Sequence, residues 1–350
     1  MNKDFTPTYY SIKQDIRDKI AGGIYSPGEL LPSRNVMCEL YDCSWGTLNR
    51  AITELILEGL LTARKGKGTY VSNQEPPREN NPHQAADTLN VWLCNKHRSV
   101  YATLSEMMDG MRDEAHKRGV SIRFLDLADL QSIPPGLDEY IIVTPSNDQW
   151  NVLVDARNKG ERFVVLNSSW EQAPFPCVDS DIYGAVFEAV GYLLKQGHQR
   201  IGLLGIRDGF TNYERRVDSF RDAFKQYGVP LENQWIVGRP EDRTEAKVLY
   251  SNWLDRNPEV TALFAADYTT TLILLELLQE KGITIPADLS LFIVGTPQHA
   301  FVQNGSVSAI VQPFHEMGRL AVSRLLERQL DSGTELLPCE LKIGDSVVAI

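Results

Sequence analysis

The sequence has few cysteines and no long hydrophobic run, and both shortages exclude whole classes of protein. Only five of its 350 residues are cysteine. They are odd in number and lack zinc-ligand spacing, so we expect reduced structural thiols and no metal. The longest mostly apolar runs, such as residues 272–278, are far shorter than a bilayer span. No apolar signal segment follows the first lysine, so we expect a cytoplasmic protein with no membrane partner.

The motifs of the common enzyme classes are also missing from the chain. We find no nucleophile elbow, no P-loop and no pair of catalytic carboxylates. The glycines of "GLLGIRDG", residues 202–209, have the wrong spacing for a dinucleotide-binding turn. The sequence therefore predicts a protein that is not an enzyme and that uses no cofactor.

Positive charge is scarce over most of the chain, and its distribution is uneven. Residues 1–74 hold nine Lys or Arg and eight Asp or Glu, for a net charge of +1. The rest of the chain carries a net charge of −12, so the whole chain has a net charge of −11. A near-neutral N-terminal part on an acidic body is typical of a nucleic-acid reader joined to a domain that does not bind nucleic acid.

A polar stretch with three prolines, residues 73–88, separates these two parts. Its composition indicates an exposed linker. We therefore expect a DNA-binding domain at residues 1–74, a linker at residues 75–88 and a body at residues 89–350.

The N-terminal part has the pattern of a helix-turn-helix. Apolar residues at helical spacing predict a first helix, which ends at Gly22-Gly23. Ser33 can cap a short helix that reaches Tyr41, and Ser44 can cap a second that runs to about Glu58. Two short helices joined in this way are the elements of a helix-turn-helix.

A cluster of basic residues in "ARKGKGTYV", residues 63–71, follows this pair of helices. Short strands at Leu60–Arg64 and Thr69–Ser72 would make the glycines and lysines between them a hairpin tip. Glycine lets the backbone approach a phosphate, and lysine neutralises it. By itself the hairpin could equally be a solvated turn with incidental lysines. Beside a helix-turn-helix, the pattern favours a DNA-binding wing.

After the linker, apolar strands alternate with amphipathic helices. The expected strands are "LNVWLCN", "SIRFLDL", "EYIIVTP", "RFVVLNS", "RIGLLGI", "ALFAAD" and "LSLFIVG". Such alternation over some 260 residues predicts α/β structure with doubly wound parallel sheets, and its length favours two similar lobes. Ligands of such folds bind at the carboxyl ends of the strands.

The first 74 residues resemble the winged helix-turn-helix of the GntR family. The matching segments are "YYSIKQDIRDKIAGGIYSPGELLPS", "SWGTLNRAITELILEGLL" and "RKGKGTYV". The resemblance implies DNA contacts at Ser33, Arg34, Asn35, Ser44, Trp45, Thr47, Asn49, Arg50, Arg64, Lys65, Gly66, Lys67 and Gly68.

This segment departs from the family at two helix positions where arginine is usual. Trp45 and Asn49 occupy them, with Arg50 beside the second. Asn49 could bond to adenine, and Arg50 suits guanine or phosphate. Trp45 could equally be a packing residue. The operator of relatives is therefore not carried over to this chain.

Residues 89–350 resemble the effector domain of the LacI/GalR family, which is similar to periplasmic sugar-binding proteins. The matching segments are "DSDIYGAVFEAVGYLLKQGHQRIGLLG", "ERRVDSFRDAF", "LFAADYTTTLILLELLQEKGITIPADLSLFIVG" and "IVQPFHEMGRLAVSRLL". A GntR-type head on this body resembles the architecture of arabinose-responsive repressors. The resemblance implies a homodimer and a two-lobed, periplasmic-binding-protein-like domain that closes on a small sugar.

The family pattern also points to residues for the ligand cleft. The resemblance implies Arg216, Asp267, Asn167 and Thr296, and by their places in loops we add His97, Tyr101 and Trp170. Arg216 could instead form a surface ion pair, and Trp170 could be a core or rim residue. Thr296 stands where many relatives have an aspartate that binds sugar hydroxyls, which weakens a hexose assignment. His198 is interpreted as structural.

By the resemblance we expect one lobe at about residues 89–178 and 312–332, and the other at about 180–297 and 336–350. The hinges would lie near residues 178–181, 296–300 and 330–336. The predicted function is a transcriptional regulator, specifically a repressor, that binds a double-stranded DNA operator under control of a sugar. A regulator that binds DNA without any ligand is the alternative that Thr296 leaves open.

Overall fold

The computed structural model forms two compact units, residues 1–86 and 87–350, each of which is described by itself. Within the described parts of the chain, no helix is long and apolar enough to cross a membrane. The described residues are 8–41, 43, 45–57, 60–64, 68–72, 88–93, 101–126, 139–295 and 305–350.

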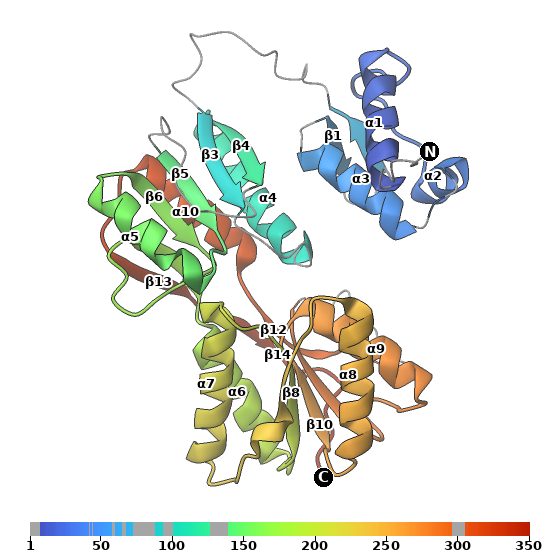
Figure 1. Ribbon diagram of the computed structural model, residues 1–350, viewed down its shortest axis with the longest axis vertical. Helices are drawn as coiled ribbons and strands as arrows, with labels where there is room; N and C mark the ends of the chain where they lie inside the picture. The colour runs from blue at the N-terminus through green and yellow to red at the C-terminus, as the bar shows by residue number, and fades with distance from the viewer. Residues whose placement is uncertain are drawn as a thin grey trace, which may run out of the picture. The chain divides into compact units, whose positions relative to one another are not determined.

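In its described residues, the N-terminal unit has three helices followed by a two-stranded hairpin (Figure 1). The strands pair antiparallel from Leu61 opposite Val71 to Arg64 opposite Gly68. Gly68 has φ +110°, a conformation that glycine adopts without strain. The elements are α1 (Thr8–Ala21), α2 (Arg34–Tyr41), α3 (Trp45–Leu57), β1 (Leu61–Arg64) and β2 (Gly68–Val71).

One apolar face of each helix builds the core of this unit. In α3, Leu48, Ile52 and Leu55 are fully buried at helical spacing, and they meet Ile12 and Ile16 of α1. Ser33 precedes α2 as expected, and its Oγ accepts a bond from the backbone N–H of Val36 at 3.5 Å. The short helices form because their apolar faces are buried together, since helices of this length are marginal alone.

The second unit contains two six-stranded sheets, and the first of them defines lobe 1. All its neighbouring strands pair parallel, in the order β13-β7-β6-β5-β3-β4. Its strands are β3 (Thr88–Leu93), β4 (Ser121–Asp126), β5 (Glu139–Val143), β6 (Arg162–Leu166), β7 (Pro176–Ser180) and β13 (Gly333–Leu337), and its helices are α4 (Tyr101–Lys117), α5 (Trp150–Asn158) and α10 (Phe314–Leu326).

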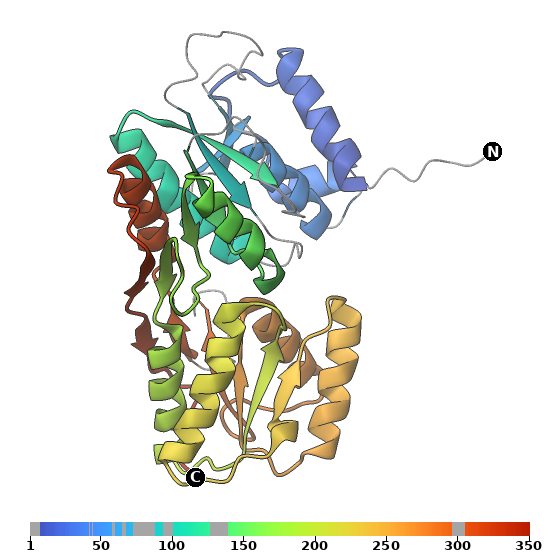
Figure 2. The ribbon, with the colours of Figure 1, turned by 60° about the vertical axis from the view of Figure 1, so that its left-hand side comes forward.

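The second sheet defines lobe 2 and has the order β14-β12-β11-β10-β8-β9. Only the edge strand β14 pairs antiparallel. In Figures 1 and 2, α6 and α7 cover one face of this sheet and α8 and α9 cover the other. The strands are β8 (Ile201–Ile206), β9 (Ile236–Gly238), β10 (Ala262–Ala265), β11 (Ser290–Val294), β12 (Ser308–Val311) and β14 (Glu340–Lys342), and the helices are α6 (Ile182–Lys195), α7 (Thr211–Gln226), α8 (Arg243–Arg256) and α9 (Tyr268–Glu280).

Burial on both faces explains why the central strands are continuously apolar. Every residue of β10 and β11 is buried, as parallel sheets covered by helices on both sides require. In lobe 1 the rings of Trp92, Tyr140 and Phe163 stack across neighbouring strands, with centroid distances of 4.3 and 5.5 Å. The predicted fold class, a winged helix-turn-helix with a two-lobed α/β domain, is confirmed.

The chain passes between the lobes three times, and two of the passages differ from the expected hinges. The first follows β7 at about Asp181, where it was expected. The second follows β12, at residues 312–313 in place of 296–300. The third follows β13, at residues 338–339, a few residues after the expected 330–336. β12 and β13 are short, and β13 is only partly buried, so neither has the apolar run that marks a strand in sequence.

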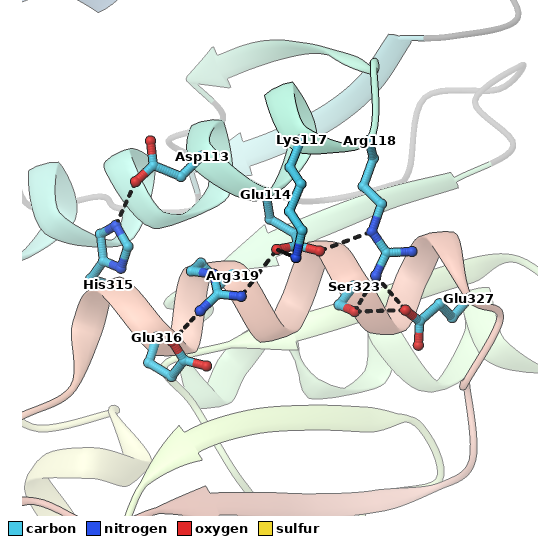
Figure 3. A network of polar contacts seen from close by, with 9 residues as sticks. All are labelled: Asp113, Glu114, Lys117, Arg118, His315, Glu316, Arg319, Ser323 and Glu327. Carbon is cyan, nitrogen blue, oxygen red and sulfur yellow. Dashed lines mark hydrogen bonds and ion pairs between the residues drawn. The ribbon is translucent and has the colours of Figure 1, made fainter.

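Helices α4 and α10 pack against each other unusually closely. A Cβ atom on Gly110 would lie 1.9 Å from the carbonyl oxygen of His315, and one on Gly318 would lie 2.1 Å from that of Met107. The two glycines therefore let the backbones touch. Figure 3 shows polar side chains that join the same helices, with Glu114 between Arg118 and Arg319.

Candidate functional site

A cavity of about 520 Å³, part of it open to solvent, lies where strands of both lobes end. Nearly all its lining residues follow a strand directly or begin the next helix, as ligand sites in open α/β sheets do. They are Thr144 and Asn167 from lobe 1, with Arg207, Phe210, Asn212, Tyr213, Arg216, Asp267, Tyr268, Val294, Gly295, Gln312 and Phe314.

The lobe 1 wall includes two residues with positive φ. Thr144 follows β5 with φ 52°, and Asn167 follows β6 with φ 61°. Asparagine tolerates this conformation, but a β-branched threonine rarely adopts it. The Asn167 amide donates to Thr144 Oγ1 at 2.9 Å, which holds both side chains in place. Strained backbone of this kind concentrates at binding sites.

On the lobe 2 wall, Asp267 is held by several donors. Its carboxylate caps α9 by accepting from the Thr270 N–H at 2.7 Å, and it also accepts from Tyr213 Oη at 2.5 Å and from Arg239 at 3.2 Å. Burial alone would raise the pKa of Asp267. The charge of Arg239 and the bonds from Tyr213 and Thr270 outweigh burial, so the pKa lies below its ordinary value.

Two arginines of lobe 2 also line the cavity, each against an aromatic ring. The guanidinium carbon of Arg216 lies 4.6 Å from the ring centre of Tyr213, and that of Arg207 lies 4.9 Å from that of Phe210. Arg216 also donates to Gln312 Oε1 at 3.3 Å. Burial lowers the pKa of Arg207. These contacts fix the planes of both donor groups.

Several buried polar atoms of the lining residues have no hydrogen-bond partner among the residues that the structure describes. They are Asn167 Oδ1, Asn212 Oδ1 and Arg216 Nε. A buried polar atom without a partner is costly, so native proteins rarely leave one unexplained. Amide oxygens accept from hydroxyl groups and a guanidinium donates to oxygen. The cavity can therefore bind a small molecule rich in oxygen.

The expected ligand residues are distributed unevenly around this cavity. Asn167, Arg216 and Asp267 line it. Trp170 does not; it packs against Trp150 and Phe175, at centroid distances of 5.3 and 6.0 Å. Its indole N–H donates to Asn147 at 3.2 Å. The roles of all four remain predictions.

The other expected ligand residues cannot be assigned to the cavity. Tyr101 is the first residue of α4, and its side chain lies outside the described part of the structure. His97 and Thr296 lie outside the described residues altogether.

Sequence reasoning missed most of the lining. Arg207 directly follows the predicted strand "RIGLLGI" and Thr144 lies at the end of the predicted strand "EYIIVTP", so examining the carboxyl ends of the predicted strands would have found both. Gln312 follows β12, which the sequence analysis did not predict. Asn212 and Tyr213 lie in the first turn of α7 and have no distinctive sequence signal.

The DNA-binding candidates lie at the start of α2, along α3 and on the hairpin. Ser33 is exposed, and Arg34 is the half-buried first residue of α2. Burial lowers the pKa of Arg34. Trp45 and Asn49, four residues apart, share one face of α3, and Asn49 is half-buried.

The remaining candidates of this unit are described in part. Thr47 and Arg50 belong to α3, Asn35 to α2 and Arg64 to β1, but their side chains are outside the description, as is that of Trp45. Gly68 begins β2. Ser44, Lys65, Gly66 and Lys67 lie outside the described residues.

Metal binding has no support in the part of the chain that the structure describes. No group of three or more His, Cys, Asp and Glu side chains there could hold an ion.

His198, interpreted as structural, is fully buried and bonds to Thr261 and to the Val348 carbonyl.

Both units match known protein families. Residues 8–71 match the gntR family of bacterial regulatory proteins. Residues 190–347 match the periplasmic binding protein-like domain.

Two curated relatives resemble much of the chain. The arabinose metabolism transcriptional repressor of Geobacillus stearothermophilus is 25% identical over 346 residues, which cover 93% of this chain and 92% of the relative. The HTH-type transcriptional repressor CytR of Escherichia coli K12 is 26% identical over 244 residues, 68% of this chain and 70% of the relative. These relatives are repressors and not enzymes.

A solved structure shows the same fold. The LacI family transcriptional regulator from Enterococcus faecium with bound ribose superposes with a TM-score of 0.63 and is 21% identical. The match covers 75% of this chain and 99% of that one.

Proposed function

Because the chain joins a DNA-binding domain of the gntR family to a periplasmic-binding-protein-like domain, we propose that it is a transcriptional repressor controlled by a small sugar. Its affinity for a double-stranded operator would change when a pentose or a related sugar binds between the two lobes. Such a repressor works where the chromosome is, so the proposal places it in the cytoplasm.

The cavity at the strand ends is the observation that carries this proposal. It combines residues of both lobes, so a ligand there would contact Thr144 and Asn167 on one side and Arg216 and Asp267 on the other. A ligand that touches both lobes stabilises the lobe arrangement in which both contacts are made. The buried polar atoms of the cavity lining that have no partner among the described residues favour an oxygen-rich ligand.

The names of relatives favour a pentose as the first ligand to test. One relative over nearly the whole chain is a repressor of arabinose metabolism, and a structure of the same fold holds ribose. By the family pattern, Thr296 stands where many relatives have an aspartate that binds sugar hydroxyls, which weakens a hexose assignment.

In the proposed complex with DNA, α3 enters the major groove. Asn49 and Arg50 would then reach base edges, and Lys65 and Lys67 at the hairpin tip would neutralise phosphates. A homodimer formed through residues 89–350 would present two heads to two half-sites about one helical turn, or a multiple of it, apart. By linkage, a sugar that releases DNA must bind the DNA-free form more tightly.

The test is to measure DNA affinity and thermal stability with and without sugars. DNA selected from a random pool by the full-length protein would serve as the operator. We expect one sugar among pentoses, deoxyhexoses, hexoses, their phosphates and nucleosides to raise Tm and to change DNA affinity at least tenfold. In Arg216→Gln both sugar effects should disappear, with sugar-free DNA affinity within about twofold of the wild type.

A control and a contradicting result complete this experiment. Arg221→Gln changes an exposed residue of the same helix and should respond to the sugar as the wild type does. Intact DNA binding with no shift for any ligand would favour a regulator that binds DNA without one. Loss of DNA binding in Arg216→Gln would make Arg216 a structural residue.

A further inference from the structure

The charges around the cavity do not balance. Arg207 and Arg216 both line it, and they are only 8% and 4% exposed. Among the residues that the structure describes, neither guanidinium forms an ion pair; the polar partner of Arg216 is the neutral amide of Gln312. A buried charge without a counter-charge is strongly unfavourable. Two such charges at one cavity therefore call for an anion that the described chain does not provide.

The carboxylates that act electrostatically on these arginines are engaged elsewhere or exposed. Asp267 forms an ion pair with Arg239 at 3.2 Å and accepts from Tyr213 and Thr270. Glu241, which also acts on Arg207, is exposed to solvent. Arg239 thus compensates Asp267, and the charge of Arg207 remains.

Asp179 interacts electrostatically with Arg216, but its carboxyl group is fully buried and bonds to serines of lobe 1. Its carboxylate accepts from Ser169 Oγ and from the Ser180 N–H, each at 2.8 Å. Burial raises the pKa of Asp179, although both these bonds and the nearby Arg215 and Arg216 lower it. A carboxyl group whose ionisation is opposed by burial is a weak counter-charge.

Two segments that follow strands of the sheets, one of them directly after the lining residue Gly295, contain no acidic residue in the sequence. Residues 296–304, which follow Gly295 of the lining, are "TPQHAFVQN" and contain no Asp or Glu. Residues 94–100, which follow β3, are "CNKHRSV" and contain two cations and no acid. The shortage of negative charge therefore extends to both of these segments.

The helix that begins at the cavity adds positive potential. α7 starts after Phe210, and no side chain caps its first N–H groups. By contrast, Asp181, Asp242 and Asp267 cap the helices α6, α8 and α9 of the same lobe. An uncapped helix N-terminus carries a partial positive charge and favours anions. Here it lies beside Arg207 and Arg216, whose own charges make the stronger argument.

We propose that the effector is a polyhydroxylated carbohydrate that carries a carboxylate or a phosphate, and that Arg207 and Arg216 bind this anionic group. The planar guanidinium fork matches either group with two parallel hydrogen bonds. Asn167 and Asn212 would bond to the hydroxyls. This inference rests on the proposed function, because it concerns the ligand of the same cavity.

The test compares neutral sugars with their charged derivatives on the full-length protein. The probes are ribose, ribonate and ribose 5-phosphate, and arabinose, arabinonate and arabinose 5-phosphate. Calorimetry should give a Kd at least tenfold lower for a charged member than for its neutral parent, and only charged members should raise Tm at low concentration. A preference for the aldonate or for the phosphate identifies the group, and either one supports the proposal.

Substitutions separate a charge effect from a general loss of the site. Arg207→Gln keeps a polar side chain and removes the charge, so binding of the preferred charged probe should weaken at least tenfold more than binding of its neutral parent. Arg221→Gln, the exposed control on α7, should bind like the wild type. Equal weakening for neutral and charged probes would overturn the assignment of Arg207.

A readout without any sugar tests the same charge imbalance. Removing an uncompensated buried charge should raise the Tm of ligand-free Arg207→Gln, and sulfate should raise the Tm of the wild type more than that of this variant at equal ionic strength. A lower Tm for ligand-free Arg207→Gln, with no effect of sulfate or of any charged probe on the wild type, would overturn the proposal.

The two proposals fail in different ways. If a neutral sugar binds as tightly as its charged derivatives and changes DNA affinity, the anionic effector is refuted and the proposed function stands. If a charged probe binds through Arg207 without any change in DNA affinity, the anionic ligand stands and the proposed regulation fails.

Discussion

At the scale of single residues, His198 shows how a buried ring can hold a chain terminus. Its Nε2 lies 2.9 Å from the Val348 carbonyl oxygen and its Nδ1 lies 2.9 Å from Thr261 Oγ1. A carbonyl can only accept, so Nε2 carries the hydrogen and Nδ1 accepts from the Thr261 hydroxyl. Burial lowers the pKa of His198, although the bond to Val348 raises it. The neutral ring is therefore the form that the fold requires.

We expect this histidine to make the folded state less stable as the pH falls. A lowered folded-state pKa means that the unfolded chain binds the proton more readily, so stability present above pH about 6.5 is lost as the pH falls through the folded-state value. His198→Gln should cost about 1–2 kcal/mol at pH 7.5, from lost hydrogen bonds. The difference in the free energy of unfolding between His198→Gln and the wild type should be smaller at pH 5.5.

Urea unfolding at both pH values measures this difference. His116→Gln, which changes an exposed histidine, should unfold like the wild type at each pH. A difference between wild type and His198→Gln that stays constant from pH 7.5 to 5.5 would contradict the assignment of a neutral ring.

At the scale of elements, the pair α4 and α10 combines close backbone contact with a buried carboxylate. Gly110 and Gly318 permit the contact, and the Glu114 side chain, only 3% exposed, receives Arg118 at 2.9 Å and Arg319 at 3.3 Å (Figure 3). The hydrogen bond from Arg118 lowers the pKa of Glu114 more than burial raises it, and Arg319 lowers it further. The ionised carboxylate therefore joins the two helices.

Replacing this carboxylate by an amide should weaken the helix pair above pH about 4.5. A lowered folded-state pKa gives stability that is present above the unfolded-state pKa and lost as the pH falls through the folded-state pKa. Glu114→Gln should cost about 1–2 kcal/mol at pH 7, because bonds to charged groups become bonds to a neutral one. Urea midpoints measured at pH 7 and near pH 3.5 should show the gap closing with acid.

Glu316→Gln is the matched control for Glu114. Glu316 bonds to the same Arg319 at 2.9 Å, but it is 54% exposed. A surface pair of this kind contributes about 0–1 kcal/mol. Equal losses from the two substitutions would mean that the burial of Glu114 adds nothing to the pair.

At the scale of the whole molecule, charge separates the two units. Residues 1–74 carry a net +1, and the rest of the chain carries −12. An acidic body repels the phosphate backbone, so the proposed DNA binding would depend on a few cations of the N-terminal unit. Lys65 and Lys67 are close together in sequence and follow β1 at the hairpin.

Changing Lys65 and Lys67 together to alanine should weaken binding to every DNA sequence. Each lost phosphate contact removes about 0.9 from the slope of log K against log salt, so the slope should fall by about 2. Anisotropy titrations of the full-length protein from about 50 to 200 mM salt measure it. An unchanged slope would exclude the hairpin from the interface. Lys159 and Lys225, exposed on the second unit, provide the control pair, for which the slope should stay at the wild-type value.

Local sequence was enough to predict most elements of both units. The positions of α1, α2 and β8 follow from apolar spacing, capping residues and glycines, which act within a few residues of the chain. Local sequence does not explain why the second and third passages between the lobes lie later in the chain than expected. β12 and β13 are strands because neighbours distant in sequence pair with them, as β7 pairs with β13.

The sequence by itself therefore determined the two units, their fold class and three lining residues, Asn167, Arg216 and Asp267, by periodicity and family pattern. Only the tertiary structure decided that Arg207 lines the same cavity and that Arg239 already compensates Asp267. Hydrophobic patterning acts along a single element, whereas the balance of charge in a cavity depends on side chains from strands that meet only in the folded chain.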